Sequence, residues 1–148
     1  MYCKDDSRKE AFPNESFDFL GYTFRPRQAK NKLGQYFVSF LPAISRKASI
    51  KVQRVIKSWR IHHITWTTLE SISKKINPKV RGWYQYYGRF YKSAMYRPLV
   101  NIERYLVRWV QAKYKKLRGH ENLAKQFLGK VRAGSPSIFY HWTLGLRL

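Results

Sequence analysis

The sequence predicts a mainly α protein, a helical bundle preceded by a short N-terminal β-hairpin. Hydrophobic residues repeat with a helical period from residue 42 onward, whereas aromatic and β-branched residues cluster in short runs before that point. With 148 residues, 44% of them hydrophobic and five of them Trp, the chain can bury a core of its own. We therefore expect two parts: residues 1–41, which contain the hairpin, and a helical domain over residues 42–148.

Residues 17–41 carry the hairpin signal. Two runs rich in aromatic and β-branched residues flank a basic stretch containing Pro26 and Gly34, a composition typical of a turn between strands. The hairpin brings few core residues of its own, so the helices must supply most of the buried surface.

The first helix is predicted after Pro42 by a hydrophobic stripe. Its members are Ala48, Val52, Val55, Ile56 and Trp59. Cations occupy the opposite side of the same helix. They are Lys47, Lys51, Arg54 and Lys57.

Capping signals delimit the next two helices. Thr67 and Glu70 have the spacing at which the two side chains cap each other's backbone N–H groups, so a helix should begin there. Asn77 and Pro78 should end it, because Asn can cap a fresh helix whose first position Pro occupies. The fresh helix would run through the aromatic stretch to Tyr91.

A longer helix should begin at Pro98, with an apolar face and a basic face. The apolar face comprises Leu99, Ile102, Leu106, Trp109 and Val110. The opposite face would hold Arg104, Arg108, Gln111, Lys115 and Arg118. A shorter helix, from about Glu121 to Val131, follows Gly119, and residues 137–148 are apolar enough to pack back onto the bundle.

The charge of the chain points to a polyanionic partner. There are 30 Lys and Arg against 8 Asp and Glu, a formal net charge of +22. Five of the eight acids fall in the first 18 positions, which leaves Glu70, Glu103 and Glu121 for the other 130 residues. Because self-repulsion of this size destabilises a compact chain unless a partner neutralises it, nucleic acid is the leading candidate.

Several kinds of chemistry are not supported by the sequence. Nucleotidyl transfer needs carboxylates that hold two metal ions, and residues 19–148 contain no two acids close in sequence. The adjacent pair Asp5-Asp6 lies in a polar stretch that we interpret as a solvated loop. The histidines at 62, 63, 120 and 141 lack a Cys or carboxylate at ligand spacing, so we expect no metal or other cofactor and place them at the surface or against phosphates.

The expected compartment is reducing. Cys3 is the only cysteine, so no internal disulfide can form. The first ten residues lack the apolar run of a signal peptide, and the longest uncharged core stretch, around Phe37 to Ser45, is too short to span a bilayer. We expect the bacterial cytosol or an organelle matrix or stroma, with no membrane partner; a basic helix lying on an anionic membrane is a minor alternative.

Residues 81–91 (RGWYQYYGRFY) combine aromatic and basic residues on more than one helical face. Val80, Trp83, Tyr87 and Phe90 have the spacing of a buried stripe. The others could stack on bases or reach phosphates. Together with the two helical faces they form the expected RNA-binding set: Lys47, Lys51, Arg54, Lys57, Lys79, Arg81, Tyr84, Tyr86, Arg89, Tyr91, Lys92, Arg104, Arg108, Lys115 and Arg118.

Residues 77–83 (NPKVRGW), followed by Tyr86 and Tyr87, resemble the signature of the maturase-specific domain of group II intron-encoded proteins. This domain is the thumb, also called X, that follows the reverse transcriptase palm. Residues 17–24 (FDFLGYTF) are similar to the hairpin that ends the palm, and residues 139–142 (FYHW) with Gly145 are similar to the motif that closes the domain. Residues 2–8 (YCKDDSR) resemble a late palm segment, which implies that Asp5-Asp6 is not the catalytic pair.

The resemblance implies a thumb-like helical bundle after a palm remnant, without the fingers, the metal-binding palm or its Tyr-Ala-Asp-Asp motif. The chain would bind group II intron RNA, or an RNA/DNA duplex, and assist splicing, but would not be an enzyme alone. Two alternatives stay open. The chain could be the thumb subunit of a split RNA-directed DNA polymerase whose palm is a separate chain, or a structural protein that binds any RNA through charge.

Overall fold

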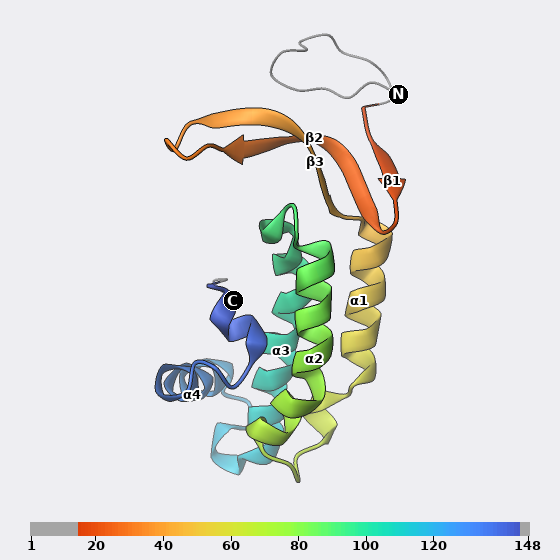
Figure 1. Ribbon diagram of the computed structural model, residues 1–148. Coiled ribbons are helices and arrows are strands. Elements are labelled where there is room, and N and C mark those ends of the chain that lie inside the picture. The colour runs from red at the N-terminus through yellow and green to blue at the C-terminus, as the bar shows by residue number, and fades with distance from the viewer. Residues whose placement is uncertain (1–14, 146–148) are drawn as a thin grey trace.

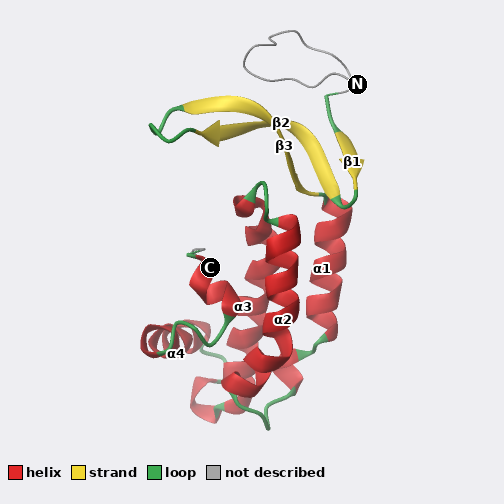
Figure 2. Ribbon diagram, viewed as in Figure 1, coloured by secondary structure: helices red, strands yellow, loops and turns green. Residues whose placement is uncertain are grey.

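The computed structural model describes residues 15–145, which form a three-stranded antiparallel sheet followed by four α-helices (Figure 1). The sheet lies over one end of the helical bundle (Figure 2). The predicted mainly α class with a short N-terminal β unit is therefore confirmed. Asp5-Asp6 and the rest of residues 2–8 lie outside the described residues. The elements are β1 (Phe17–Phe19), β2 (Tyr22–Lys30), β3 (Tyr36–Ile44), α1 (Arg46–Ser58), α2 (Leu69–Tyr87), α3 (Tyr96–Lys113) and α4 (Glu121–Gly134), with short 3-10 turns η1 (Ile61–His63), η2 (Lys92–Met95), η3 (Lys115–Leu117) and η4 (Tyr140–Leu144).

The sheet has one strand and one turn more than the predicted hairpin. Leu20 and Gly21 have φ values of 50° and 82°, the left-handed conformation that a tight two-residue turn requires at both central positions. Pro26 was expected in a turn but lies inside β2, opposite Phe40 of β3. Because β1 pairs only with residues 22–24 of β2, no strand lies beside Pro26 on the edge of β2 that faces away from β3. A proline, which lacks an N–H, is tolerated at such an edge. The last strand runs on to Ile44, past the expected end at residue 41.

The first helix forms as predicted and begins at a side-chain cap. The Ser45 hydroxyl accepts a hydrogen bond from the Ala48 N–H at 3.1 Å, which satisfies one of the free donors of the first turn. Ala48, Val52 and Ile56 are buried, so the expected hydrophobic stripe of α1 faces the core.

The second helix differs from the prediction both at its N-terminal cap and at its predicted end, Asn77-Pro78. Its cap is Thr68, whose hydroxyl accepts from the Ser71 N–H at 3.2 Å, while the Thr67 hydroxyl donates to the Ile64 carbonyl. The helix also continues through Pro78. Ile76 and Val80, on either side of Pro78, are buried in the same core. Burial of this stripe outweighs the roughly 3 kcal/mol that a proline costs inside a helix.

The third helix buries its predicted apolar face but ends before its predicted basic face does. Leu99, Ile102 and Leu106 are fully buried. At Tyr114 the backbone becomes extended (φ −104°, ψ 107°), and the Tyr114 ring packs 5.1 Å from Phe127 of α4. The turn that follows lets α4 fold against α3. This helix is the one predicted to follow Gly119.

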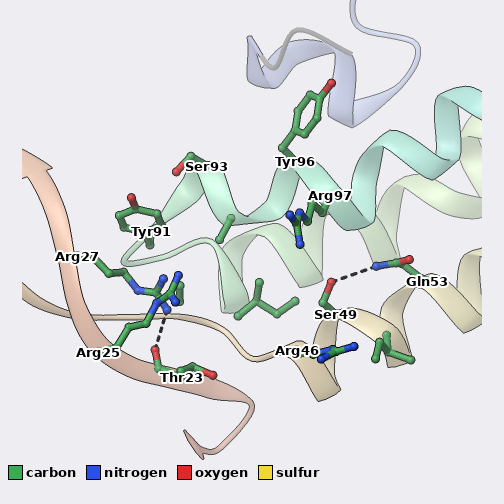
Figure 3. A pocket seen from close by; sticks show the side chains of 14 residues that line it. Thr23, Arg25, Arg27, Arg46, Ser49, Gln53, Tyr91, Ser93, Tyr96 and Arg97 are labelled. Atoms are coloured by element: carbon green, nitrogen blue, oxygen red, sulfur yellow. Dashed lines mark hydrogen bonds between the residues drawn. The ribbon is translucent and has the colours of Figure 1, made fainter. Parts of the chain in front are cut away.

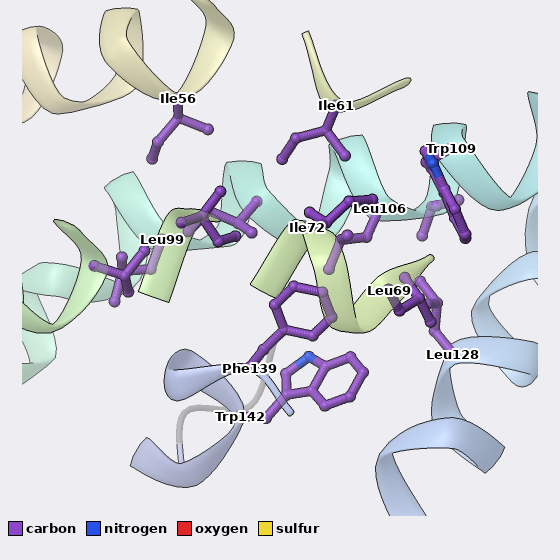
Figure 4. Packing of buried hydrophobic residues seen from close by; sticks show 14 of the residues in the cluster. Ile56, Ile61, Leu69, Ile72, Leu99, Leu106, Trp109, Leu128, Phe139 and Trp142 are labelled. Carbon is purple, nitrogen blue, oxygen red and sulfur yellow. The ribbon is translucent and has the colours of Figure 1, made fainter. Parts of the chain in front are cut away.

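Residues 138–144 close the core, as predicted (Figure 4). Phe139 and Trp142 pack among residues of α2 and α3, and their rings lie 4.8 Å apart. His141 was expected at the surface but is fully buried, because its Nε2 lies 2.7 Å from the Glu103 carboxylate, which provides a polar partner inside the protein. The indole N–H of Trp142 donates to the same carboxylate oxygen.

Asn77 holds the closing segment to α2 instead of capping a helix. Its side-chain amide donates to the Ile138 carbonyl at 2.7 Å, and its carbonyl oxygen accepts from the Tyr140 N–H at 2.9 Å.

We expect Asn77→Ala to lower the free energy of unfolding by roughly 1–3 kcal/mol, because two backbone groups lose their partner. Urea denaturation measures the change. Gln85→Ala, an exposed position on the same helix, is the control. Equal stability of the two variants would contradict the role of Asn77.

Candidate functional site

The four cations predicted on α1 form one exposed stripe. Each side chain is exposed, on the side of the helix away from Ala48, Val52 and Ile56. A shallow pocket of about 580 Å³ lies along this stripe, and Asp18 is the acidic residue in its lining. The stripe consists of Lys47, Lys51, Arg54 and Lys57.

Arg104 and Arg108 lie on α3, where they line a pocket of about 670 Å³ together with Glu103 and Glu121. The helices α1 and α3 pack against each other, and the Asn101 amide donates to the Gln53 side-chain oxygen across the junction at 3.2 Å. Arg104, exposed one turn further along α3, donates to Asn101 at 3.3 Å, and Arg108 is exposed on the same side. We call these six residues the α1–α3 surface: Lys47, Lys51, Arg54, Lys57, Arg104 and Arg108.

The electrostatic field near this surface is positive. His62 lies in the turn after α1, with its ring 5.5 Å from that of Tyr105 on α3. Burial, together with the positive charges of His63, Arg108 and Arg60, lowers the pKa of His62 below its ordinary value. Burial is the larger cause, and the contribution of Arg108 shows that this cation lies near the turn after α1.

Other predicted cations lie elsewhere. Lys115 and Arg118 are exposed but follow the end of α3, so they do not continue the line of Arg104 and Arg108, which corrects the predicted basic face. Lys79 and Lys92 are exposed at α2 and η2. Two more have aromatic contacts outside the surface: the Arg81 guanidinium lies 5.3 Å from the Tyr140 ring, and that of Arg89 lies 5.5 Å from the Phe90 ring.

The three tyrosines proposed for base stacking make contacts within the protein. The Tyr86 hydroxyl donates to the Leu20 carbonyl at 2.9 Å, and the Tyr22 hydroxyl donates to the Tyr86 carbonyl. Tyr91 donates to the Gln28 carbonyl at 3.5 Å. The Tyr84 ring packs against Tyr140 with 6.1 Å between centroids. Tyr86 and Tyr91 therefore join the sheet to the helices. Only the exposed parts of these tyrosine rings could contact a base.

The predicted packing stripe in this segment is confirmed in part. Val80 is fully buried, and the half-buried Trp83 stacks on Trp59 of the α1 C-terminus at 5.5 Å. Phe90 was assigned to the core but is 51% exposed. It lies beyond the end of α2 at Tyr87, so the helical spacing that suggested its burial no longer applies.

A cleft of about 860 Å³ gathers four arginines that are absent from the predicted RNA-binding set (Figure 3). They are Arg25, Arg27, Arg46 and Arg97. Arg25 and Arg27 alternate with Pro26 on β2 and therefore point to the same face of the strand. This alternation is the one signal in the sequence that could have indicated the cleft.

Neither a metal cluster nor a membrane span is found in residues 15–145. No three His, Cys, Asp or Glu side chains of these residues gather as metal ligands. None of the helices formed by the same residues is long and apolar enough to cross a bilayer.

Comparison with known proteins identifies the helical part. A family model described as "Group II intron, maturase-specific domain" matches residues 50–127, more than half of the chain. Neither the curated proteins nor the solved structures gave a match. The matched range runs from α1 through α2 and α3 into α4, and contains the 77–83 motif together with five of the six cations of the α1–α3 surface. The chain therefore belongs to the family of group II intron maturase-specific domains.

Proposed function

We propose that the chain binds group II intron RNA and assists its splicing, and that the α1–α3 surface contacts the phosphates of that RNA. Family membership supports a role connected with group II introns. The observation that carries the binding proposal is the surface itself, because it holds six exposed cations on two helices that pack against each other. Regularly spaced cations of this kind contact the nucleic-acid backbone and do not read bases.

We also propose that this chain does not synthesise DNA on its own. The matched domain is the maturase-specific domain and not the catalytic palm of a reverse transcriptase. Residues 19–148 hold three acids, Glu70, Glu103 and Glu121, which are far apart in sequence. Glu103 is the polar partner of His141 and Trp142, and no three His, Cys, Asp or Glu side chains of residues 15–145 gather as metal ligands for phosphoryl chemistry. The compartment of such a protein would be that of the intron RNA, a bacterial cytosol or an organelle.

A competition experiment tests the RNA partner. The full chain is titrated with a folded group II intron RNA and with a tRNA, at one fixed salt concentration, because phosphate-driven affinities depend strongly on salt. We expect tighter binding of the intron RNA when affinities are compared per unit length. Equal affinity per unit length for both RNAs would favour a general RNA-binding protein and overturn the maturase proposal.

A further inference from the structure

The arginine cleft lies where the sheet meets the helical bundle. Arg25 and Arg27 reach into it from β2, Arg46 from the first turn of α1 and Arg97 from the first turn of α3 (Figure 3). Three of these side chains, Arg25, Arg46 and Arg97, are exposed and have no hydrogen-bond partner among residues 15–145. Segments far apart in the sequence thus bring four guanidinium groups to one opening.

The lining of the cleft is strongly positive. None of the described residues that line the cleft is acidic. Arg27 is half-buried and is held in place, because its Nε donates to the Leu41 carbonyl at 3.1 Å and its Nη2 to the Thr23 carbonyl at 3.0 Å. Burial and the nearby charge of Arg25 lower the pKa of Arg27 below its ordinary value, so the site carries an electrostatic cost in the absence of an anion.

The chemistry of the cleft fits phosphate better than carboxylate or a neutral ligand. A guanidinium presents paired N–H donors that match the oxygens of a phosphate, and several guanidinium groups can neutralise adjacent phosphates along one strand. The volume of about 860 Å³ is within the range of pockets that enclose small ligands, which suits a few nucleotides of a single strand better than a double helix. Tyr96 is also part of the lining and is 40% exposed, with its ring directed away from the arginines (Figure 3).

We propose that the arginine cleft binds the sugar-phosphate backbone of a single nucleic-acid strand, and that Arg25 and Arg97 contact its phosphates directly. The site shares none of the six cations of the α1–α3 surface but adjoins it, because Arg46 lines both the cleft and the pocket along the α1 stripe. The proposal rests on the proposed function in one respect: the strand would be an unpaired segment of the RNA that the chain binds.

Fluorescence anisotropy with a labelled uridine octamer tests the cleft in the full chain. In the double variant Arg25→Gln/Arg97→Gln, affinity should fall about a hundredfold, because each charge-assisted hydrogen bond lost costs roughly tenfold. The slope of log K against log salt should flatten by about 1.4, since each phosphate contact in a single strand contributes about 0.7. The control is Lys74→Gln/Lys75→Gln, which removes two exposed positive charges from α2.

The outcomes separate this inference from the proposed function. If both double variants lose affinity equally, or if the parent chain binds intron RNA but not the octamer, the cleft proposal is overturned and the intron proposal stands. If the parent binds the octamer through Arg25 and Arg97 but does not prefer intron RNA to tRNA, only the intron proposal fails. If a thymidine deoxyoctamer binds as tightly as the uridine octamer, the cleft recognises phosphate alone. If it binds more weakly, the cleft also contacts the ribose hydroxyl. Both results support the cleft proposal. Circular dichroism checks folding, and the two single variants replace the double variant if it unfolds.

Discussion

Replacing Glu103 with Ala should lower the free energy of unfolding at neutral pH by roughly 3–5 kcal/mol, the range observed when one member of a buried polar pair is removed. The Glu103 side chain is only 18% exposed, and its carboxylate is the polar partner of both His141 and Trp142. The variant leaves two buried N–H groups without an acceptor. His141 is the more affected of the two, because its Nδ1 already has no partner among the described residues.

The effect should depend on pH. Burial alone would raise the pKa of Glu103, but the hydrogen bonds from His141 and Trp142 and the nearby charges of His141 and Arg132 lower it below its ordinary value of 4.5. A carboxyl whose pKa is lowered by folding stabilises the protein fully above that ordinary value, and this contribution is lost as the pH falls through the folded-state pKa. The parent and the variant should therefore approach each other in stability below about pH 4.

Urea denaturation of both proteins at neutral pH and at pH values below 4.5 measures the two effects. Glu121→Ala is the matched control, since Glu121 is an exposed carboxylate of α4 paired with Lys125 at 2.6 Å. It should change stability little, because exposed ion pairs contribute little. A Glu103→Ala variant as stable as Glu121→Ala at neutral pH would show that the network does not hold the closing segment.

Replacing Lys47, Lys51, Arg54 and Lys57 together by Gln should weaken intron RNA binding on the order of a hundredfold or more at about 0.1 M salt. If all four contact phosphates, the slope of log K against log salt should flatten by about three units, since each contact contributes between about 0.7 and 0.9. The fold should persist, because these side chains are exposed on the side of α1 away from Val52 and Ile56.

Titrations at several salt concentrations, with thermal melts of each protein, test this surface. The control removes four other exposed charges, by changing Lys74, Lys75, Lys116 and Lys130 to Gln. Net charge falls equally in the two proteins, so any difference reports where the RNA lies. Equal losses of RNA affinity in the two proteins would mean that binding follows net charge alone. An unchanged slope of log K against log salt in the α1 variant would mean that the stripe contacts only solvent.

The parts of the fold that the sequence predicted are those with a local physical cause. Hydrophobic periodicity located α1 and α3, because burial of one face determines which helix positions are apolar. The capping signals failed where tertiary contacts compete. Asn77 is a good helix cap, but its amide instead joins residues 138 and 140, more than 60 positions away. No local pattern reports a partner at that distance.

The same distinction applies to the candidate site. The stripe on α1 was predictable, because four cations on one helix face depend on helix geometry alone. Where Arg104 and Arg108 lie relative to that stripe depends on how α1 and α3 pack, which the sequence does not specify locally. The arginine cleft was missed for this reason, since its members come from a strand and two helices, and only Arg25 and Arg27 are close in sequence.

The closing segment has a consequence for synthesis of the chain. The helices α1, α2 and α3 leave the ribosome before Phe139 and Trp142, which fill the core between them. Until that segment emerges, apolar residues of α2 and α3 have no cover, and exposed surface of this kind makes a nascent chain prone to aggregation. A bound polyanion does not cover these residues, because the cations lie on the outer faces of the helices. Nascent chains halted before residue 139 should therefore depend more on chaperones than those halted well beyond it.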